Sequence, residues 1–150
     1  MESLTASKQK KAWELLAEKG NIMDGCVSVI NALRRKYRLL LASSASRGTI
    51  DIFFRKSGLE NSFEVYLDGA SVERAKPAPD IYLLALRRLY LEPDQCVVIE
   101  DSINGMRAAM TAGIPVIAFV ENEENSMLSL LSSVHPAAIV SKLTHIQQYL

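Results

Sequence analysis

The chain has 150 residues, 49% of them hydrophobic, which is enough for one compact domain with a buried core. Its 17 basic and 17 acidic side chains cancel, so net charge gives no reason to expect a nucleic-acid partner. The apolar run Ile114–Val120 is too short to cross a bilayer, and no membrane association is expected. Two distant cysteines and a polar N-terminus predict a cytoplasmic protein without disulfides.

The first part of the chain is predicted to be helical. A helix is expected over Leu4–Lys19, with Gly20 as its stop. Asn21–Gly25 reads as a turn, and a second helix follows over about Val27–Lys36. Two helices before the first strand are an unusual start for a sheet protein.

Five short apolar runs are predicted to be strands. They are continuous rather than alternating, as in strands covered on both faces. The five runs are Arg38–Ala42, Phe63–Leu67, Cys96–Ile99, Pro115–Phe119 and Ala137–Val140.

Segments with helical periodicity separate or follow these runs. They are marked by Ile50 to Ser57, Ile81 to Leu89, Ile103 to Met110 (with Gly113 as the C-cap), Met127 to Leu131, and Leu143 to Leu150. This alternation predicts a doubly wound parallel α/β sheet, in which functional residues gather at the carboxyl ends of strands.

Polar residues follow two of the predicted strands. Ser43 and Ser44 end the first, where a hydroxyl and backbone N–H groups could hold a phosphate; the alternative is a helix N-cap. Glu100 and Asp101 follow the third, and such hard oxygen ligands suit Mg²⁺. There the alternative is that Asp101 or Ser102 caps the next helix.

Lys76 lies between these two pairs in the sequence. It precedes Pro77, and Pro79 and Asp80 are placed to begin a helix. A lysine held between two prolines could neutralise a phosphoryl oxygen; the alternative is a solvated lysine in a turn.

Taken in order, the motifs resemble those of the haloacid dehalogenase (HAD) superfamily, and more closely its phosphoglycolate phosphatase and β-phosphoglucomutase-like group. The resemblance covers roughly residues 22–145 and rests on three segments: Leu39–Ser44, Lys76–Tyr82 and Val97–Ala109. It implies a Mg²⁺-dependent phosphatase or phosphomutase acting on a small phosphorylated metabolite.

The resemblance also implies roles for single residues. Ser43 and Lys76 would be catalytic, and together with Ser44 they would bind the transferring phosphoryl group. Glu100 and Asp101 would bind Mg²⁺. Family members form an aspartyl-phosphate on the first aspartate of an Asp-x-Asp-Gly motif.

No two of the six aspartates are spaced as Asp-x-Asp, so the nucleophile is missing. Met23–Cys26 imitates half of that motif, but it follows a helix and precedes Ser43 by too little chain to hold a cap domain. By the resemblance, residues 1–20 are a remnant of the last cap helix, and residues 21–150 are a core without its first strand. That strand would lie between the strands ending at Ser43 and at Ile99, so its absence would leave two unpaired edges.

Three functions are therefore considered. The first is a phosphatase or phosphomutase core that is inactive without its aspartate. It would be a fragment, a truncated gene model, or a degraded relative that needs a partner strand or self-associates through its unpaired edges. The second is a non-catalytic relative that binds phosphate or metal. The third is an unrelated nucleotide-binding domain, which the lack of a glycine-rich phosphate loop disfavours.

Overall fold

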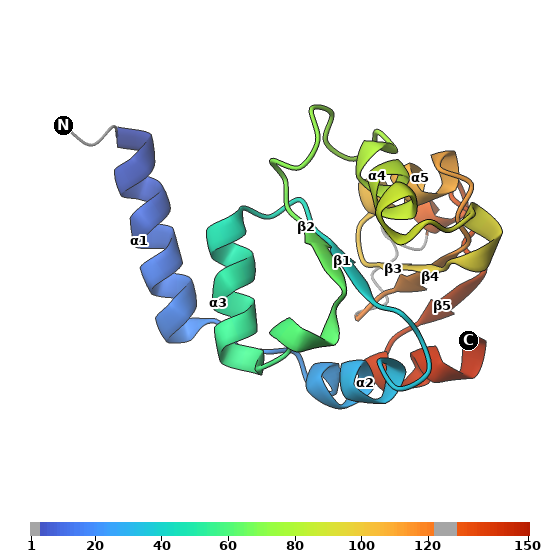
Figure 1. Ribbon diagram of the computed structural model, residues 1–150, viewed down its shortest axis with the longest axis horizontal. Coiled ribbons are helices and arrows are strands. Elements are labelled where there is room, and N and C mark those ends of the chain that lie inside the picture. The colour runs from blue at the N-terminus through green and yellow to red at the C-terminus, as the bar shows by residue number, and fades with distance from the viewer. Residues whose placement is uncertain (1–3, 122–128) are drawn as a thin grey trace.

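The computed structural model describes residues 4–121 and 129–150, with side chains from Lys8 onward. It shows a parallel α/β fold with helices packed around the strands (Figure 1). The predicted fold class is confirmed, and each of the five predicted strands has a counterpart. The strands are β1 Leu40–Ala42, β2 Val65–Leu67, β3 Val98–Glu100, β4 Val116–Phe119 and β5 Ala138–Val140.

The observed strands are shorter than the apolar runs that predicted them. Apolar character marks residues that become buried, whereas a strand begins only where a neighbour supplies ladder hydrogen bonds. The third strand also ends one residue later than expected. Glu100 belongs to β3 because it pairs with Ala118 of β4.

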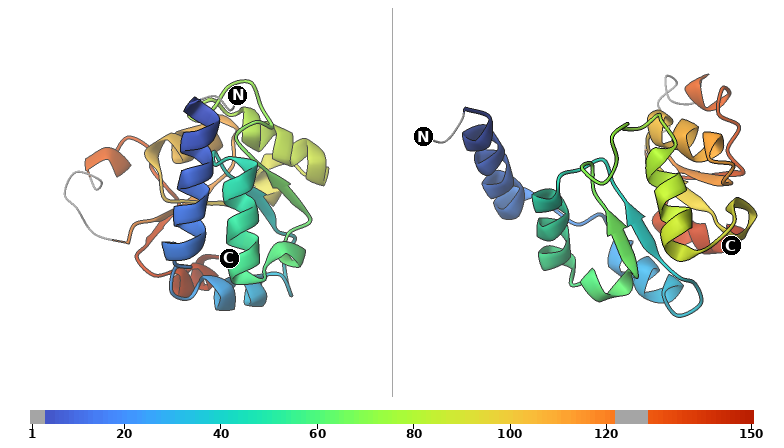
Figure 2. Two further views of the ribbon diagram at one scale, coloured as in Figure 1. Left: turned by 90° about the vertical axis from the view of Figure 1, so that its left-hand side faces the viewer. Right: turned by 45° about the horizontal axis from the view of Figure 1, so that its top comes forward.

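The strands form two separate parallel sheets. One has the order β1-β2 and the other β3-β4-β5, and β1 and β3 are not paired with each other. This is the division expected from a missing strand between them. Figure 2 shows the two sheets from other directions.

Five of the predicted helices are α-helices in the described ranges, and the last predicted one, over Leu143–Leu150, is a 3₁₀ segment instead. The α-helices are α1 Leu4–Lys19, α2 Cys26–Leu33, α3 Arg47–Ser57, α4 Asp80–Leu89 and α5 Ile103–Thr111, with 3₁₀ segments η1 Glu60–Ser62, η2 Pro93–Gln95 and η3 Leu143–Tyr149. The predicted helix Met127–Leu131 falls partly on residues 122–128, which lie outside the described part of the chain. No helix in the described ranges is long and apolar enough to cross a membrane.

One of two predicted helix ends differs in the structure and the other agrees. The helix α2 ends at Leu33 rather than Lys36, and residues 34–36 form turns whose N–H groups bond back to it. The helix α5 ends as predicted, since Gly113 follows it with φ 80°, a conformation that glycine adopts without strain.

The main core lies between α4, α5 and the strands. It includes the buried residues Tyr82, Met106 and Ala118, and β1 packs against its margin through Leu40 and Ala42. The helix α4 contacts β1, β2 and α5, and therefore joins the two sheets on one face. A smaller cluster around Ile117 and Ile146 lies between the three-stranded sheet and η3, which α2 also contacts.

Candidate functional site

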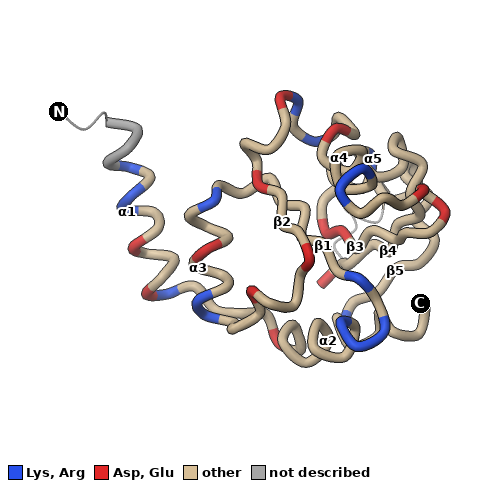
Figure 3. Tube along the Cα trace, in the orientation of Figure 1, with Lys and Arg blue, Asp and Glu red and all other residues tan. Residues whose placement is uncertain are grey.

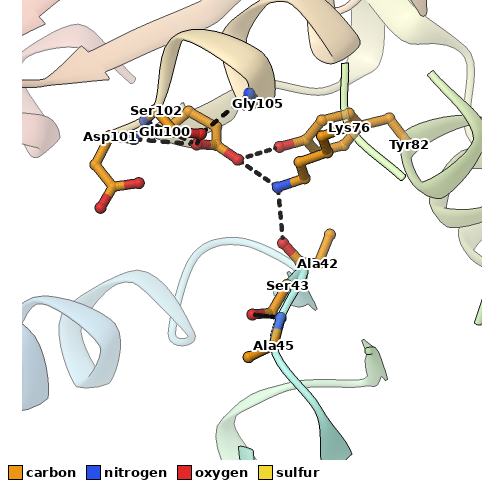
Figure 4. A network of polar contacts seen from close by, with 9 residues as sticks. All are labelled: Ala42, Ser43, Ala45, Lys76, Tyr82, Glu100, Asp101, Ser102 and Gly105. Carbon is orange, nitrogen blue, oxygen red and sulfur yellow. Dashed lines mark hydrogen bonds and ion pairs between the residues drawn. The ribbon is translucent and has the colours of Figure 1, made fainter. Parts of the chain in front are cut away.

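Lys76 lies where the ends of β1 and β3 come together. Its ammonium donates a hydrogen bond of 3.3 Å to the carbonyl of Ala42 and forms an ion pair with Oε1 of Glu100 (Figure 4). Only 9% of its side chain is exposed, and its nitrogen lies 4.9 Å from the centre of the Tyr82 ring. The alternative of a solvated turn lysine is therefore wrong.

Both carboxylate oxygens of Glu100 are engaged. Oε1 also accepts a hydrogen bond of 2.8 Å from the Tyr82 hydroxyl. Oε2 accepts from the Asp101 N–H at 3.2 Å, and from the N–H and hydroxyl of Ser102 at 3.1 and 2.9 Å. Glu100 thus ties Lys76 to the start of α5.

The charge states of this cluster follow from its burial and its partners. Burial raises the pKa of Glu100, but hydrogen bonding and charge from Lys76, with hydrogen bonds from Tyr82 and Ser102, outweigh it and leave that pKa lowered. Burial, followed by the charge and hydrogen bond of Glu100, raises the pKa of Tyr82. The cluster therefore holds an ionised carboxylate with a neutral phenol as donor.

Asp101 differs from its neighbour. It is exposed, and Figure 4 shows its carboxylate turned away from Lys76. Adjacent residues at a strand end point in different directions, which separates the two acids. The N-cap of α5 is Ser102, whose hydroxyl accepts the Gly105 N–H at 3.0 Å. The capping alternative is thus confirmed for Ser102 and not for Asp101.

Ser43 and Ser44 lie in the loop after β1. The Ser43 N–H bonds to the carbonyl of Leu67 at 2.9 Å, and its hydroxyl accepts from the Ala45 N–H at 3.1 Å. Ser44 is exposed. The N-cap of α3 is Ser46, so the capping alternative is wrong for both serines. The structure therefore brings this loop to the same edge as Lys76 and Asp101.

Sequence reasoning gave no role to three residues that shape the site. Tyr82 ends the segment Lys76–Tyr82, but its hydrogen bond to Glu100 joins α4 to the end of β3, which is distant in the sequence. At Gly105 an added Cβ would lie 2.0 Å from the Glu100 carboxylate, and at Gly69 it would lie 2.6 Å from the Ser44 carbonyl. Only residues without a side chain fit there.

Hollows elsewhere on the surface do not coincide with this cluster. One of about 640 Å³ lies beside Asn21–Gly25 and Lys142, and one of about 490 Å³ lies beside the turn Arg34–Arg38. Figure 3 shows the basic residues of this turn directly after α2. Neither hollow is lined by Lys76 or Asp101. Among the described residues, no three His, Cys, Asp or Glu side chains gather as a metal cage. The candidate site is thus an open edge between two sheets.

Residues 3–113 match the family model of the haloacid dehalogenase-like hydrolases. The chain belongs to this family.

Relatives and solved structures agree with this assignment. The chain is 33% identical, over 93% of its length, to the phosphorylated carbohydrates phosphatase of Thermotoga maritima, of which it spans 65%. The crystal structure of CbbY from Rhodobacter sphaeroides in complex with phosphate superposes with a TM-score of 0.72 at 28% identity, covering 95% of this chain and 66% of that one. The magnesium-bound HAD-hydrolase YfnB of Bacillus subtilis shares the fold, with a TM-score of 0.84 at 18% identity over 100% of this chain and 64% of that one.

Proposed function

We propose that this chain carries the phosphate- and Mg²⁺-binding side of a phosphotransfer site, in the core of a phosphatase or phosphomutase for small phosphorylated sugars. The observation that carries the proposal is the buried cation of Lys76, fixed at the carboxyl ends of β1 and β3. Two similar proteins support the substrate class: the Thermotoga phosphatase by its name, and CbbY by its bound phosphate.

Phosphate binding is assigned to Lys76 and the loop after β1. An ammonium has three donors, and Lys76 directs two of them at Ala42 and Glu100, which leaves one for a phosphoryl oxygen. The Ser43 hydroxyl and the backbone N–H of the exposed residue Ser44 would supply further donors at the same edge. Because Lys76 is held in place before the ligand arrives, little ordering is needed on binding.

The exposed carboxylate of Asp101 fits Mg²⁺ as one ligand of an ion that it shares with the phosphate. Mg²⁺ is commonly bound through one or two carboxylates, with waters and phosphate oxygens completing the shell. When bound, the ion would neutralise phosphate charge. Both oxygens of Glu100 are engaged, so we assign to it the positioning of Lys76; its role as a direct ligand stays a prediction.

We further propose that these 150 residues bind phosphate without turning it over. An aspartyl-phosphate needs an aspartate in line with the phosphorus, and the sequence has no Asp-x-Asp pair. Asp101 is assigned to the metal, and a working site would take its nucleophile from polypeptide beyond this sequence. The second candidate function is phosphate binding without catalysis, and the same residues at the carboxyl ends of β1 and β3 support it.

Two free cysteines fit a reducing compartment such as the cytoplasm.

Calorimetric titration with inorganic phosphate, with and without Mg²⁺, tests the proposal. We expect phosphate binding to be lost in Lys76→Met and kept in the matched control Lys36→Met, which changes an exposed lysine in the basic turn. Asp101→Asn should remove the gain from Mg²⁺ and leave the metal-free affinity unchanged. Equal affinities in wild type and Lys76→Met would overturn the proposed site. Turnover of glucose 6-phosphate or glucose 1-phosphate by this chain alone would overturn the proposed inactivity.

A further inference from the structure

A hollow of about 490 Å³ lies beside the turn that joins α2 to β1, and no residue of the candidate site lines it. Its walls come from residues 34–39 and from residues 61–64, which precede β2. We name it the arginine hollow, after Arg34, Arg35 and Arg38. We propose that the arginine hollow binds a nucleoside diphosphate, with the linked phosphates on the arginines and the ring against Tyr37.

The charges that line the arginine hollow are unbalanced. Glu64 is the one acidic residue among the described residues of its lining, and Arg38 engages both of its oxygens, at 2.9 Å for Oε1 and 2.8 Å for Oε2. The side chains of Arg35 and of its neighbour Lys36 are exposed and have no hydrogen bond or ion pair with any residue that the structure describes. The surplus positive charge therefore attracts an anion.

The turn is held in place before a ligand arrives. The backbone N–H groups of residues 34–37 bond back to the end of α2, over distances of 2.9 to 3.4 Å. Arg38 also donates a hydrogen bond of 3.0 Å to the carbonyl of Leu89, the last residue of α4. Arg38 thus ties the turn to α4 and to the residue before β2, and Arg34 and Arg35 are left for the ligand. Little ordering is then needed on binding.

A buried hydroxyl belongs to the same lining. Ser62 is only 8% exposed, and its Oγ accepts a hydrogen bond of 3.4 Å from Nη1 of Arg34. The hydroxyl proton itself has no acceptor among the described residues. Because buried polar groups are normally paired, this donor favours a ligand that accepts. A phosphate oxygen can accept from the hydroxyl and from the Arg34 guanidinium together.

Two available guanidinium groups favour two linked phosphates over one. Each guanidinium is a planar fork of donors that matches two oxygens of one phosphate. Arg34 and Arg35 are adjacent in the turn, and neither forms an ion pair with a described residue. A single phosphate satisfies one such fork, so inorganic phosphate should be a poor ligand here. A diphosphate can satisfy both.

Aromatic side chains indicate that the ligand also carries a ring. Tyr37 and Phe63 line the arginine hollow, and Tyr37 is 44% exposed. An exposed aromatic ring beside cations is a platform on which a nucleobase stacks. The volume also lies within the range of small-molecule sites, about 300–1,000 Å³. The inference uses none of the residues of the proposed phosphotransfer site and does not depend on that function.

Titration of the ¹⁵N-labelled chain with ADP, without Mg²⁺, tests the inference. We expect saturable shift changes at the Tyr37, Asn61 and Ser62 amides. The exposed double variant Arg34→Gln/Arg35→Gln should bind ADP about tenfold more weakly or worse, because charged hydrogen bonds are lost. The matched control Arg87→Gln/Arg88→Gln removes the same charge from exposed positions of α4 outside the lining. It should weaken binding by less than about twofold, since distant surface charges are screened.

A ring variant separates the two parts of the ligand. Tyr37→Ala should lower the affinity for ADP and leave the affinity for pyrophosphate unchanged, because pyrophosphate has no ring to stack. Equal losses for the two ligands would overturn the assignment of the ring to Tyr37.

Three further results would overturn the inference. The first is equal ADP affinity in the arginine variant and its control. The second is a set of shift changes confined to the loop after β1, which would assign ADP to the candidate site. The third is tighter binding of an oligothymidylate than of ADP, which would assign the turn to nucleic acid. Inorganic phosphate titration of Arg34→Gln/Arg35→Gln reports on the candidate site alone, so failure of one proposal can be told from failure of the other.

Discussion

The two sheets differ in how completely they are built. Every residue of β4 is buried, and α5 packs its small residues Ala108 and Ala109 into the core beside it. In the two-stranded sheet only Leu67 is buried, and α1 is held mainly through α3. Similar apolar sequences are thus fully buried in β4, which has a strand on each side, and mostly half-buried in β1 and β2, which pair only with each other among the described residues.

The candidate site lies at the junction of these two regions. Lys76 comes from the chain between them, Ala42 and Ser43 from the two-stranded side, and Glu100 and Asp101 from the three-stranded side. The network around Glu100 anchors Lys76 firmly to the three-stranded side. The single bond to Ala42 is its direct link to the other. Substitutions at this junction test whether the two sheets unfold together.

The largest effect is expected from Lys76→Met. The buried Glu100 carboxylate would lose its cation, and breaking a buried pair from one side destabilises by about 3–5 kcal/mol. Urea unfolding followed by circular dichroism measures the change. The double variant Lys76→Met/Glu100→Gln should recover much of the loss because no buried charge remains. A single variant as stable as wild type would show that the pair does not couple the regions.

A smaller loss is expected from Gly105→Ala. The new Cβ would lie 2.0 Å from the Glu100 carboxylate, which must then move from Lys76 and Ser102. Overpacking of this kind costs about 1–3 kcal/mol. Urea unfolding gives the value, and Asn104→Ala, an exposed change in the same helix, should alter it by less than about 0.5 kcal/mol. Matching values for the two variants would refute the steric argument.

The stability of the junction should also depend on pH. Because the pKa of Glu100 is lowered in the folded protein, its contribution is complete above the unfolded value of about 4.3 and is lost as pH falls through the folded value. The free energy of unfolding should thus fall less on acidification in Glu100→Gln than in wild type. Glu73→Gln, which alters an exposed acid, is the control and should follow wild type. Parallel pH profiles for all three proteins would contradict the assignment.

The smallest global effect is expected from Gly48→Ala, far from the junction. An added Cβ would lie 2.6 Å from the Trp13 ring and should displace α1 from α3. Because α1 contributes no residue to the described core clusters, the midpoint of urea unfolding should change little. Limited proteolysis should instead cut within α1 faster than in Arg55→Ala, an exposed change on α3. A large shift in the midpoint would show that α1 is part of the cooperative core.

Local sequence patterns predicted the strands and most helices well. A short continuous apolar run such as Pro115–Phe119, preceded by Gly113, favours a strand covered on both faces over a helix, so composition and length indicate it. The sequence also predicted the end of α5, because Gly113 can adopt the positive φ that commonly follows the last turn of a helix. The absence of an Asp-x-Asp pair is also visible in the sequence, and the gap in the sheet is what the family resemblance implies from it.

The roles of individual site residues depended on tertiary contacts. Sequence reasoning treated Glu100 and Asp101 as a pair, yet the end of β3 buries the first and exposes the second. Lys76 meets Glu100 only because the topology brings the ends of β1 and β3 together, across 24 residues of sequence. The need for glycine at position 105 follows from that packing as well.

The sequence by itself therefore determined which segments form strands and helices and which polar residues follow them, because these depend on local periodicity. The tertiary structure alone decided that Lys76 is buried, that Glu100 holds it, and that the carboxyl ends of β1 and β3 lie together around it. These properties depend on contacts between segments far apart in the chain, and the order of residues within each segment does not specify them.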